Sequence, residues 1–239
     1  MCSAPISFQE GCRSRAATNA LENESNRFLK EAGGKEQGPP ILFFPDDAIK
    51  TVMTRETVKN ILECSCLRCM SFARALSKDC YKDRTRYLTS ILSQATKLFA
   101  VLTAIGYPSL IGGFAYYDQM DDNFWGKRRS LRKILRKNID SQIVDDIVET
   151  FREKSRQFRT PTLTNDHFVK FPPGTVLPFY NTEKVGQGAF GSVYSFRICT
   201  GYGDFGDTNN HSDVVSCSNL RDKCTLTLYK RCMQEKRWR

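Results

Sequence analysis

Residues 87–105, YLTSILSQATKLFAVLTAI, form the most regular apolar pattern of the chain. Large apolar side chains recur there at intervals of three and four residues, which places them on one face of an α-helix. They are Tyr87, Leu88, Ile91, Leu92, Ala95, Leu98, Phe99, Leu102 and Ile105. Gly106 and Pro108 end the pattern, because glycine favours the position after a helix and proline cannot continue one. This stretch predicts one long helix and a mainly α-helical fold class.

Segments on both sides of this stretch carry the same helical spacing. In MTRETVKNIL, residues 53–62, Thr54 is a candidate N-cap and Glu56 lies in the first turn. The apolar residues that share a face are Val58, Ile61 and Leu62 in this segment, and Ile143, Val144, Ile147, Val148 and Phe151 after Ser141. We therefore predict a helical domain over 42–160, and we expect these residues to fold without the rest of the chain.

The composition is that of a basic globular protein. The chain has 239 residues, of which 40% are hydrophobic and 26% charged, so one or two small domains fit its length. Residues 1–41 hold few large apolar side chains, and we interpret them as a disordered arm. The net charge of +10 favours acidic partners.

Nothing in the sequence suggests export or membrane insertion. The first residues lack the apolar core of a secretory signal, and the longest apolar stretch, LFAVLTAI at 98–105, is too short to span a bilayer. We therefore expect no transmembrane segment and an intracellular, cytoplasmic location. In that reducing compartment the ten cysteines are expected to be thiols or metal ligands instead of a disulfide framework.

Four cysteines are close together in sequence. Cys64, Cys66, Cys69 and Cys80 could supply four thiolates to zinc, but their spacing is not a common zinc-finger pattern. If residues 55–76 form one helix, Cys66 and Cys69 share a face and Cys64 points away. We therefore expect these four thiols to bind no stoichiometric metal.

The character of the sequence changes after residue 160. The segment FPPGTVLPF, residues 171–179, contains three prolines and one glycine, which break helices and favour an extended connection. We interpret 161–178 as a linker. The runs FYNTEKV and SVYSFRI that follow are rich in β-branched and aromatic residues on either side of a glycine turn, which predicts a β-hairpin and makes the chain α+β overall.

The turn between these runs has the pattern G-x-G-x-x-G-x-V over residues 186–193. Glycines allow a backbone to lie against phosphate groups, and the N–H groups of such a loop can point at their oxygens. The rival use of this spacing is a dinucleotide-binding turn, in which a helix follows the third glycine. Here the residues that follow, VYSFRI, favour a strand, so the hairpin interpretation is preferred and a chance hairpin remains the other alternative.

With NDHF, the proline-bearing linker and LPF upstream, the chain resembles protein-kinase-domain proteins of filamentous fungi over about 44–198, most specifically over 177–194. The resemblance implies ATP with Mg²⁺ as cofactor and phosphorylation of protein serine or threonine. It also implies that Val185 and Val193 pack on the adenine, that Phe190 covers the loop tip, and that Gly186, Gly188 and Gly191 contact phosphates.

The rest of a kinase site is incomplete in this sequence. The best candidate for the lysine of the third strand is Lys230 in CTLTLYKRC, which requires 199–223 to be an irregular insertion within a partial small lobe over 179–239. The only histidines, His167 and His211, are not followed by Arg-Asp, and Asp204-Phe205-Gly206 lies too close to the loop to be the metal-binding motif. We therefore assign no catalytic residue, leave enzymatic activity uncertain, and expect the chain to be inactive alone.

A basic segment supports an alternative function. Residues 126–137, GKRRSLRKILRK, interleave basic side chains with Leu131, Ile134 and Leu135, a pattern that could bind anionic lipid, nucleic acid or another acidic partner. A solvated helix face is the simpler interpretation. The alternative to a kinase-like chain is thus a non-catalytic helical module that binds acidic partners.

Overall fold

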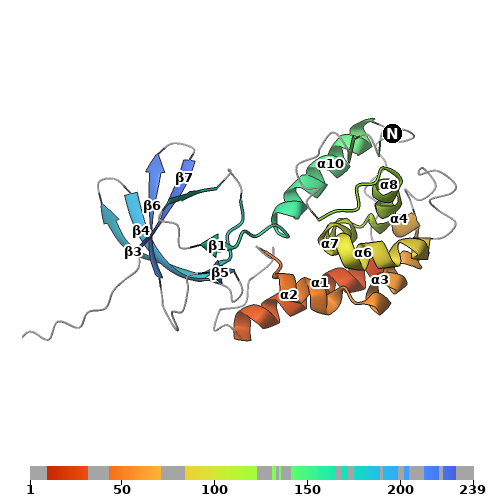
Figure 1. Ribbon diagram of the computed structural model, residues 1–239, viewed down its shortest axis with the longest axis horizontal. Helices are drawn as coiled ribbons and strands as arrows, with labels where there is room; N and C mark the ends of the chain where they lie inside the picture. Colours follow the sequence, from red (N-terminus) through yellow and green to blue (C-terminus); the bar gives the residue numbers. More distant parts are fainter. Residues whose placement is uncertain are drawn as a thin grey trace, which may run out of the picture. The chain divides into compact units, whose positions relative to one another are not determined.

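A computed structural model divides the chain into two compact units, which are described separately below (Figure 1). Unit 1 comprises residues 1–26 and 44–158, and unit 2 comprises residues 27–43 and 159–239. The residues whose structure is described are 10–31, 43–70, 84–122, 131–132, 135, 141–164, 168–171, 175–188, 191–198, 202–204, 213–220 and 223–229. More of these residues lie in helices than in strands, which confirms the mainly α-helical class.

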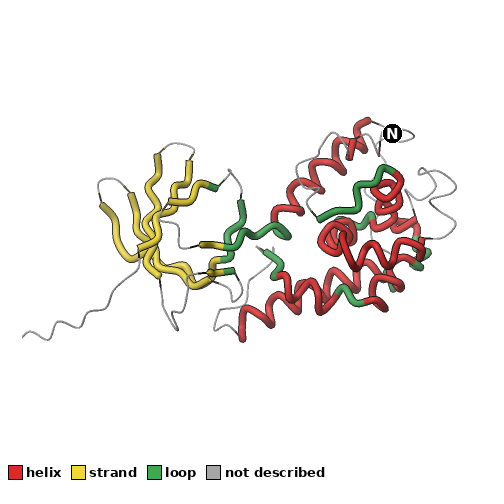
Figure 2. The backbone as a smooth tube through the Cα atoms, in the orientation of Figure 1, coloured by secondary structure: helices red, strands yellow, loops and turns green. Residues whose placement is uncertain are grey.

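Unit 1 is helical throughout its described part (Figure 2). Its elements are α1 Arg13–Glu31, α2 Asp46–Val52, α3 Arg55–Leu62, α4 Leu67–Met70, η1 Arg84–Tyr87, α6 Leu88–Gln94, α7 Thr96–Ala104, η2 Pro108–Leu110, α8 Ile111–Tyr116 and α10 Ser141–Arg156. The end of α1, from Arg27 on, is assigned to unit 2.

Helix α1 lies within the segment 1–41, so the disordered arm predicted there is wrong for residues 13–31. Buried side chains recur along it at helical spacing, and they are Ser14, Ala17, Leu21, Ser25 and Leu29. Only two of these are large and apolar, which is why composition alone did not reveal a helix. The Ser25 hydroxyl, fully buried, donates to the Leu21 carbonyl at 2.7 Å, so its burial leaves no unpaired donor.

Helix α3 begins where the sequence predicts. The Thr54 side chain caps it by accepting a hydrogen bond from the Thr57 N–H at 3.2 Å. The predicted apolar face, Val58, Ile61 and Leu62, is buried. In α10 the predicted stripe is buried except at its start, where Ile143 is 40% exposed.

The single helix predicted over 87–105 is wrong at its middle, because α6 ends at Gln94 and α7 starts at Thr96. Ala95 between them has φ −136° and ψ 30°, which is not helical. The Thr96 hydroxyl donates to the Ile91 and Leu92 carbonyls at 3.0 and 3.3 Å, and this local bond competes with a continuous helix.

The predicted end of this segment is confirmed. Gly106 has φ +83°, and the backbone bonds Gly106 N–H to Thr103 C=O and Tyr107 N–H to Leu102 C=O close the end of α7 as a Schellman motif.

Asp122 stabilises the start of α7 from a distance of 24 residues in sequence. Its carboxylate accepts a hydrogen bond from the Leu98 N–H at 2.9 Å, and its own N–H donates to the Gln94 carbonyl at 3.0 Å. Ala95, the residue at the cap position, has no side chain for this purpose. Burial raises the pKa of the Asp122 carboxyl, and the Leu98 N–H partly offsets that rise.

We expect Asp122→Ala to lower the free energy of unfolding of the chain by about 1 kcal/mol, since it removes an acceptor from a helix start. Asp122→Asn keeps a side-chain oxygen at this point and should lose less. Urea unfolding followed by far-ultraviolet circular dichroism measures both, and Asp121→Ala, at an exposed neighbour, is the control. An equal loss for Asp121→Ala and Asp122→Ala would contradict the capping role.

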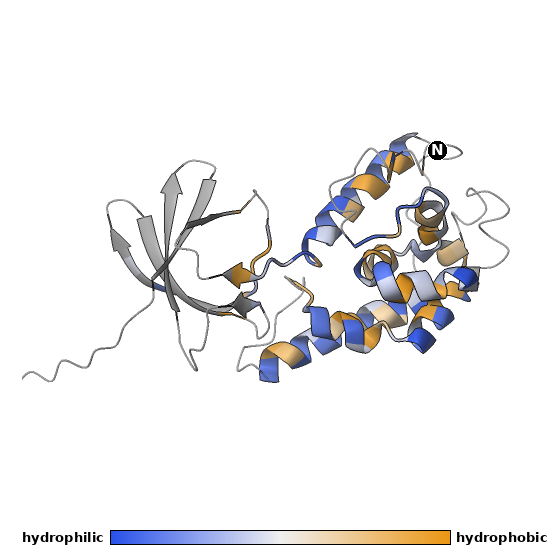
Figure 3. Ribbon diagram, viewed as in Figure 1, coloured by the Kyte–Doolittle hydropathy of each residue, from blue (hydrophilic) through white to orange (hydrophobic). Residues whose placement is uncertain are grey.

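The core of unit 1 is rich in phenylalanine. Phe44, Phe99, Phe114 and Phe158 are fully buried. The rings of Phe44 and Phe158 stack with their centroids 4.4 Å apart, and the ring centroids of Phe114 and Phe151 are 6.4 Å apart. Figure 3 shows hydrophobic and hydrophilic positions alternating along α10, as expected for a helix with one buried face.

Unit 2 contains the strands of the described chain. They are β1 Leu163–Thr164, β2 Phe168–Lys170, β3 Phe179–Gly188, β4 Gly191–Ile198, β5 Gly203–Asp204, β6 Asp213–Leu220 and β7 Lys223–Tyr229. Five of these form an antiparallel sheet in the order β2-β7-β6-β4-β3, while β1 pairs with β5 in parallel. A small core of Leu29, Phe43 and Tyr202, joined by Val176 and Ile198, belongs to the same unit.

Two sequence-based boundaries change as a result. The predicted linker 161–178 contains β1 and β2. The irregular insertion predicted over 199–223 contains β5 and β6, so it is not irregular there. For β1, β2 and β5 the cause is that these strands pair with partners more than 30 residues away along the chain, and local sequence does not encode such pairing.

Among the described helices, none is both long enough and apolar enough to cross a membrane. The described part of the basic segment 126–137 is residues 131, 132 and 135, which are helical. Leu131 and Leu135 are buried, and Arg132 pairs with Asp145 of α10 at 2.9 Å. These two leucines thus pack inside unit 1 and are not exposed for lipid insertion.

Candidate functional site

The glycine-rich segment lies on two neighbouring strands of the unit 2 sheet. Val185, Gly186 and Gly188 belong to β3, and Gly191 and Val193 belong to β4. In the antiparallel register Gly186 is opposite Val193, and Gly188 is opposite Gly191. Two irregularities in the pairing, between Tyr180 and Glu183 and between Lys184 and Gly186, come just before the glycines. Phe190 lies outside the described residues.

None of the described residues explains why position 186 is a glycine. A Cβ atom built on Gly186 meets nothing within 4 Å, and the φ angle of this residue does not lie in the left-handed region. A methyl group would therefore fit among the described residues without strain. The absence of a side chain keeps this strand backbone accessible, as a backbone that contacts a ligand requires.

The lysine predicted to complete the site is not on the strand next to β4. That strand is β6, whose Cys217 is opposite Ser192 of β4 and whose Asp213 is opposite Phe196. Its sequence, DVVSCSNL, contains no lysine. Strand β7 is one position further from β4, at roughly 9–10 Å, because neighbouring strands are about 4.8 Å apart. Lys230 follows β7 directly and lies outside the described residues. Among the described strands, β6 thus lies between β7 and β4.

The cysteines at 64, 66 and 69 do not lie on the single helix that the sequence predicts. Residues 55–76 are not one helix, since α3 ends at Leu62 and α4 begins at Leu67. Cys64 and Cys66 lie in the connection between the two helices, and Cys69 lies in α4. The direction of the Cys64 side chain is therefore not set by helical periodicity. Cys80, the fourth candidate, is outside the described residues.

Three of the four candidate cysteines cluster with another cysteine, Cys12, which is not one of the candidates. Cys12, next to the start of α1, joins Cys64, Cys66 and Cys69, and their four sulfur atoms lie within 4.8 Å of one another. Cys12 Sγ is 3.4 Å from Cys66 Sγ and 3.6 Å from Cys69 Sγ. Three of the side chains are buried, and that of Cys66 is half-buried. All four residues belong to unit 1.

Polar hydrogens surround the sulfur atoms of this cysteine cluster. The Cys69 N–H donates to Cys66 Sγ at 3.4 Å, and the Ser14 hydroxyl lies 3.1 Å from Cys69 Sγ. Burial raises the pKa of the Cys69 and Cys66 thiols. Burial also acts to raise the pKa of Cys64, but N–H groups of Cys66 and Arg13 bond its sulfur and bring that pKa down to about 7.

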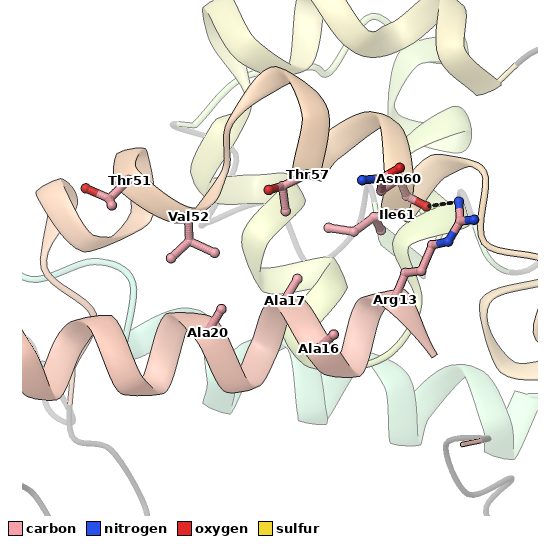
Figure 4. A pocket seen from close by; sticks show the side chains of 9 residues that line it. All are labelled: Arg13, Ala16, Ala17, Ala20, Thr51, Val52, Thr57, Asn60 and Ile61. Atoms are coloured by element: carbon pink, nitrogen blue, oxygen red, sulfur yellow. Dashed lines mark hydrogen bonds between the residues drawn. The ribbon is translucent and has the colours of Figure 1, made fainter. Parts of the chain in front are cut away.

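A shallow groove runs between α1 and the α2–α3 segment (Figure 4). Its volume is about 620 Å³, and the α1 side contributes mainly the small residues Ala16, Ala17 and Ala20. The Arg13 guanidinium closes one end by donating to the Asn60 carbonyl at 3.2 Å. The groove holds no cluster of titratable groups, so its lining indicates no chemistry.

Comparisons of the chain with protein-family models, with curated proteins and with solved structures gave no match.

Proposed function

We propose that this chain is kinase-like, with a helical N-terminal unit followed by the opening strands of a kinase small lobe. Its ligand is Mg-ATP, bound weakly through the backbone of residues 186–191. The activity that the resemblance implies is transfer of the ATP γ-phosphate to protein serine or threonine. This chain does not carry out that transfer alone.

One observation carries the proposal. Gly186 is the first glycine of a complete G-x-G-x-x-G-x-V pattern, and neither backbone strain nor crowding requires a glycine there. A ligand that approaches the strand backbone supplies the missing reason. The placement of the other two glycines opposite each other on β3 and β4 is consistent with a loop that covers phosphate groups.

The same chain lacks the groups that would move a phosphoryl group. The sequence has no His-Arg-Asp motif, and among the described strands β6 offers no lysine beside β4. Without an aspartate to orient the acceptor hydroxyl and carboxylates to hold Mg²⁺, the loop can bind phosphate but cannot stabilise the transition state.

We expect the dissociation constant of Mg-ATP to be no better than about 1 mM, or about −4 kcal/mol, because the loop acts without the rest of the site. Nuclear magnetic resonance of the full chain at increasing Mg-ATP concentration measures this. The amide signals of 186–191 should shift, and no phosphate should be transferred to a generic serine or threonine substrate.

Two variants separate ligand contact from folding. Gly186→Ala fits the open space above the strand, so it should keep the fold, while its methyl group should weaken the ATP-dependent shifts. Gly188→Val should abolish these shifts. Unshifted amides at 186–191 in the unsubstituted chain would refute ATP binding by this loop. Micromolar affinity with loop-dependent phosphotransfer would refute the proposal that this chain does not transfer phosphate alone.

A further inference from the structure

The cysteine cluster of unit 1 has the geometry of a metal site. We propose that Cys12, Cys64, Cys66 and Cys69 bind one zinc ion in a tetrahedral four-thiolate site. This proposal is independent of the kinase-like function, since all four residues lie in the helical unit.

The distances between sulfur atoms fit one ion. A tetrahedral site with Zn–S bonds of about 2.3 Å holds its sulfur atoms about 3.8 Å apart. The separations of the Cys12 sulfur from those of Cys66 and Cys69, 3.4 and 3.6 Å, are close to this value, and no pair exceeds 4.8 Å. A disulfide needs an S–S bond of about 2.05 Å, so none of these contacts is a covalent pair. A cluster of several metal atoms would need wider spacing between its thiolates.

The surroundings favour four negatively charged sulfurs. The start of α1 is the positive end of the helix dipole, and the Arg13 N–H bonds Cys64. The Cys69 N–H and the Ser14 hydroxyl approach two other sulfurs. Such contacts orient the ligands of a metal and offset the net charge of a zinc ion with four thiolates.

The number of ligands indicates the role of the ion. Four protein thiolates fill the tetrahedral shell and leave no position for water or substrate, so the site is structural and not catalytic. The ion joins the start of α1 to the α3–α4 connection, and the thiols lose their protons to solvent as they bind. A salt bridge at 3.8 Å between Arg13 and Glu63 joins the same two parts, but it is exposed and adds little.

The metal content of the full chain tests the proposal. After purification without chelator and under reducing conditions, elemental analysis should give about one zinc per chain. Cys12→Ser should reduce this to background, whereas Cys80→Ser should retain it. Cys217→Ser, a substitution of the same kind on β6 in unit 2, is the control and should also retain zinc.

Cobalt provides a second measurement that does not depend on how the variants fold. The metal-free, unsubstituted chain titrated with Co²⁺ should develop the visible bands of tetrahedral thiolate coordination, saturating at one ion per chain. Three results would each overturn the proposal: no bound metal and no such bands, an iron–sulfide cluster, or zinc that Cys80→Ser removes and Cys12→Ser does not.

Discussion

A polypeptide of residues 42–160 loses cooperative unfolding, whereas one of residues 10–160 retains it: this is the result we expect from the position of α1. The sequence alone predicts that residues 42–160 fold without the rest of the chain. In the structure, residues 1–26 belong to unit 1, and Cys12, Ala17 and Leu21 of this stretch are almost fully buried. Removing them uncovers the apolar side chains against which they pack and deletes one of the four clustered sulfurs.

The expected loss is on the order of 5 kcal/mol, from several buried side chains at about 1–3 kcal/mol each. That is comparable to the whole stability of a small domain. Thermal unfolding followed by circular dichroism, and the dispersion of amide signals, compare the two polypeptides. Equal midpoints and equally dispersed spectra would show that α1 does not contribute to the fold of unit 1.

The second large effect is expected at Phe114. This side chain on α8 is fully buried and lies with its ring 6.4 Å from that of Phe151 on α10. Phe114→Ala leaves a cavity that the surrounding helices fill only in part, so the free energy of unfolding should fall by about 3–5 kcal/mol.

Tyr116 on the same helix is the matched control, because it is also aromatic but 64% exposed. Tyr116→Ala should change stability by less than about 0.5 kcal/mol. Urea unfolding of the full chain measures both substitutions. Similar losses for the two variants would mean that α8 is not packed as described.

Features set by neighbouring residues could be predicted from the sequence. The Thr54 cap uses an N–H only three positions away, at Thr57. The end of α7 at Gly106 uses carbonyls of the last turn of that helix. The buried faces of α3 and α10 follow from spacing alone, except at Ile143 near the start of α10, which is 40% exposed.

Features set by distant residues could not be predicted. The break at Ala95 is accompanied by a cap from Asp122, and the strand order places β2 beside β7 across some 55 residues of sequence. The cysteine site needed a partner at position 12, in a stretch whose composition resembles that of an unstructured segment. The one available signal was that Cys12 is a further cysteine in the N-terminal third of the chain.

The separation of Cys12 from its partners also has a consequence for the order of events during protein synthesis. Cys69 follows Cys12 by 57 residues, which at about 5–20 residues per second is a delay of roughly 3–11 s at the ribosome. When α1 is completed at Glu31, the three partner cysteines, Cys64, Cys66 and Cys69, have still to be made. The first helix to be synthesised therefore cannot join the cysteine cluster until the start of α4 has been made.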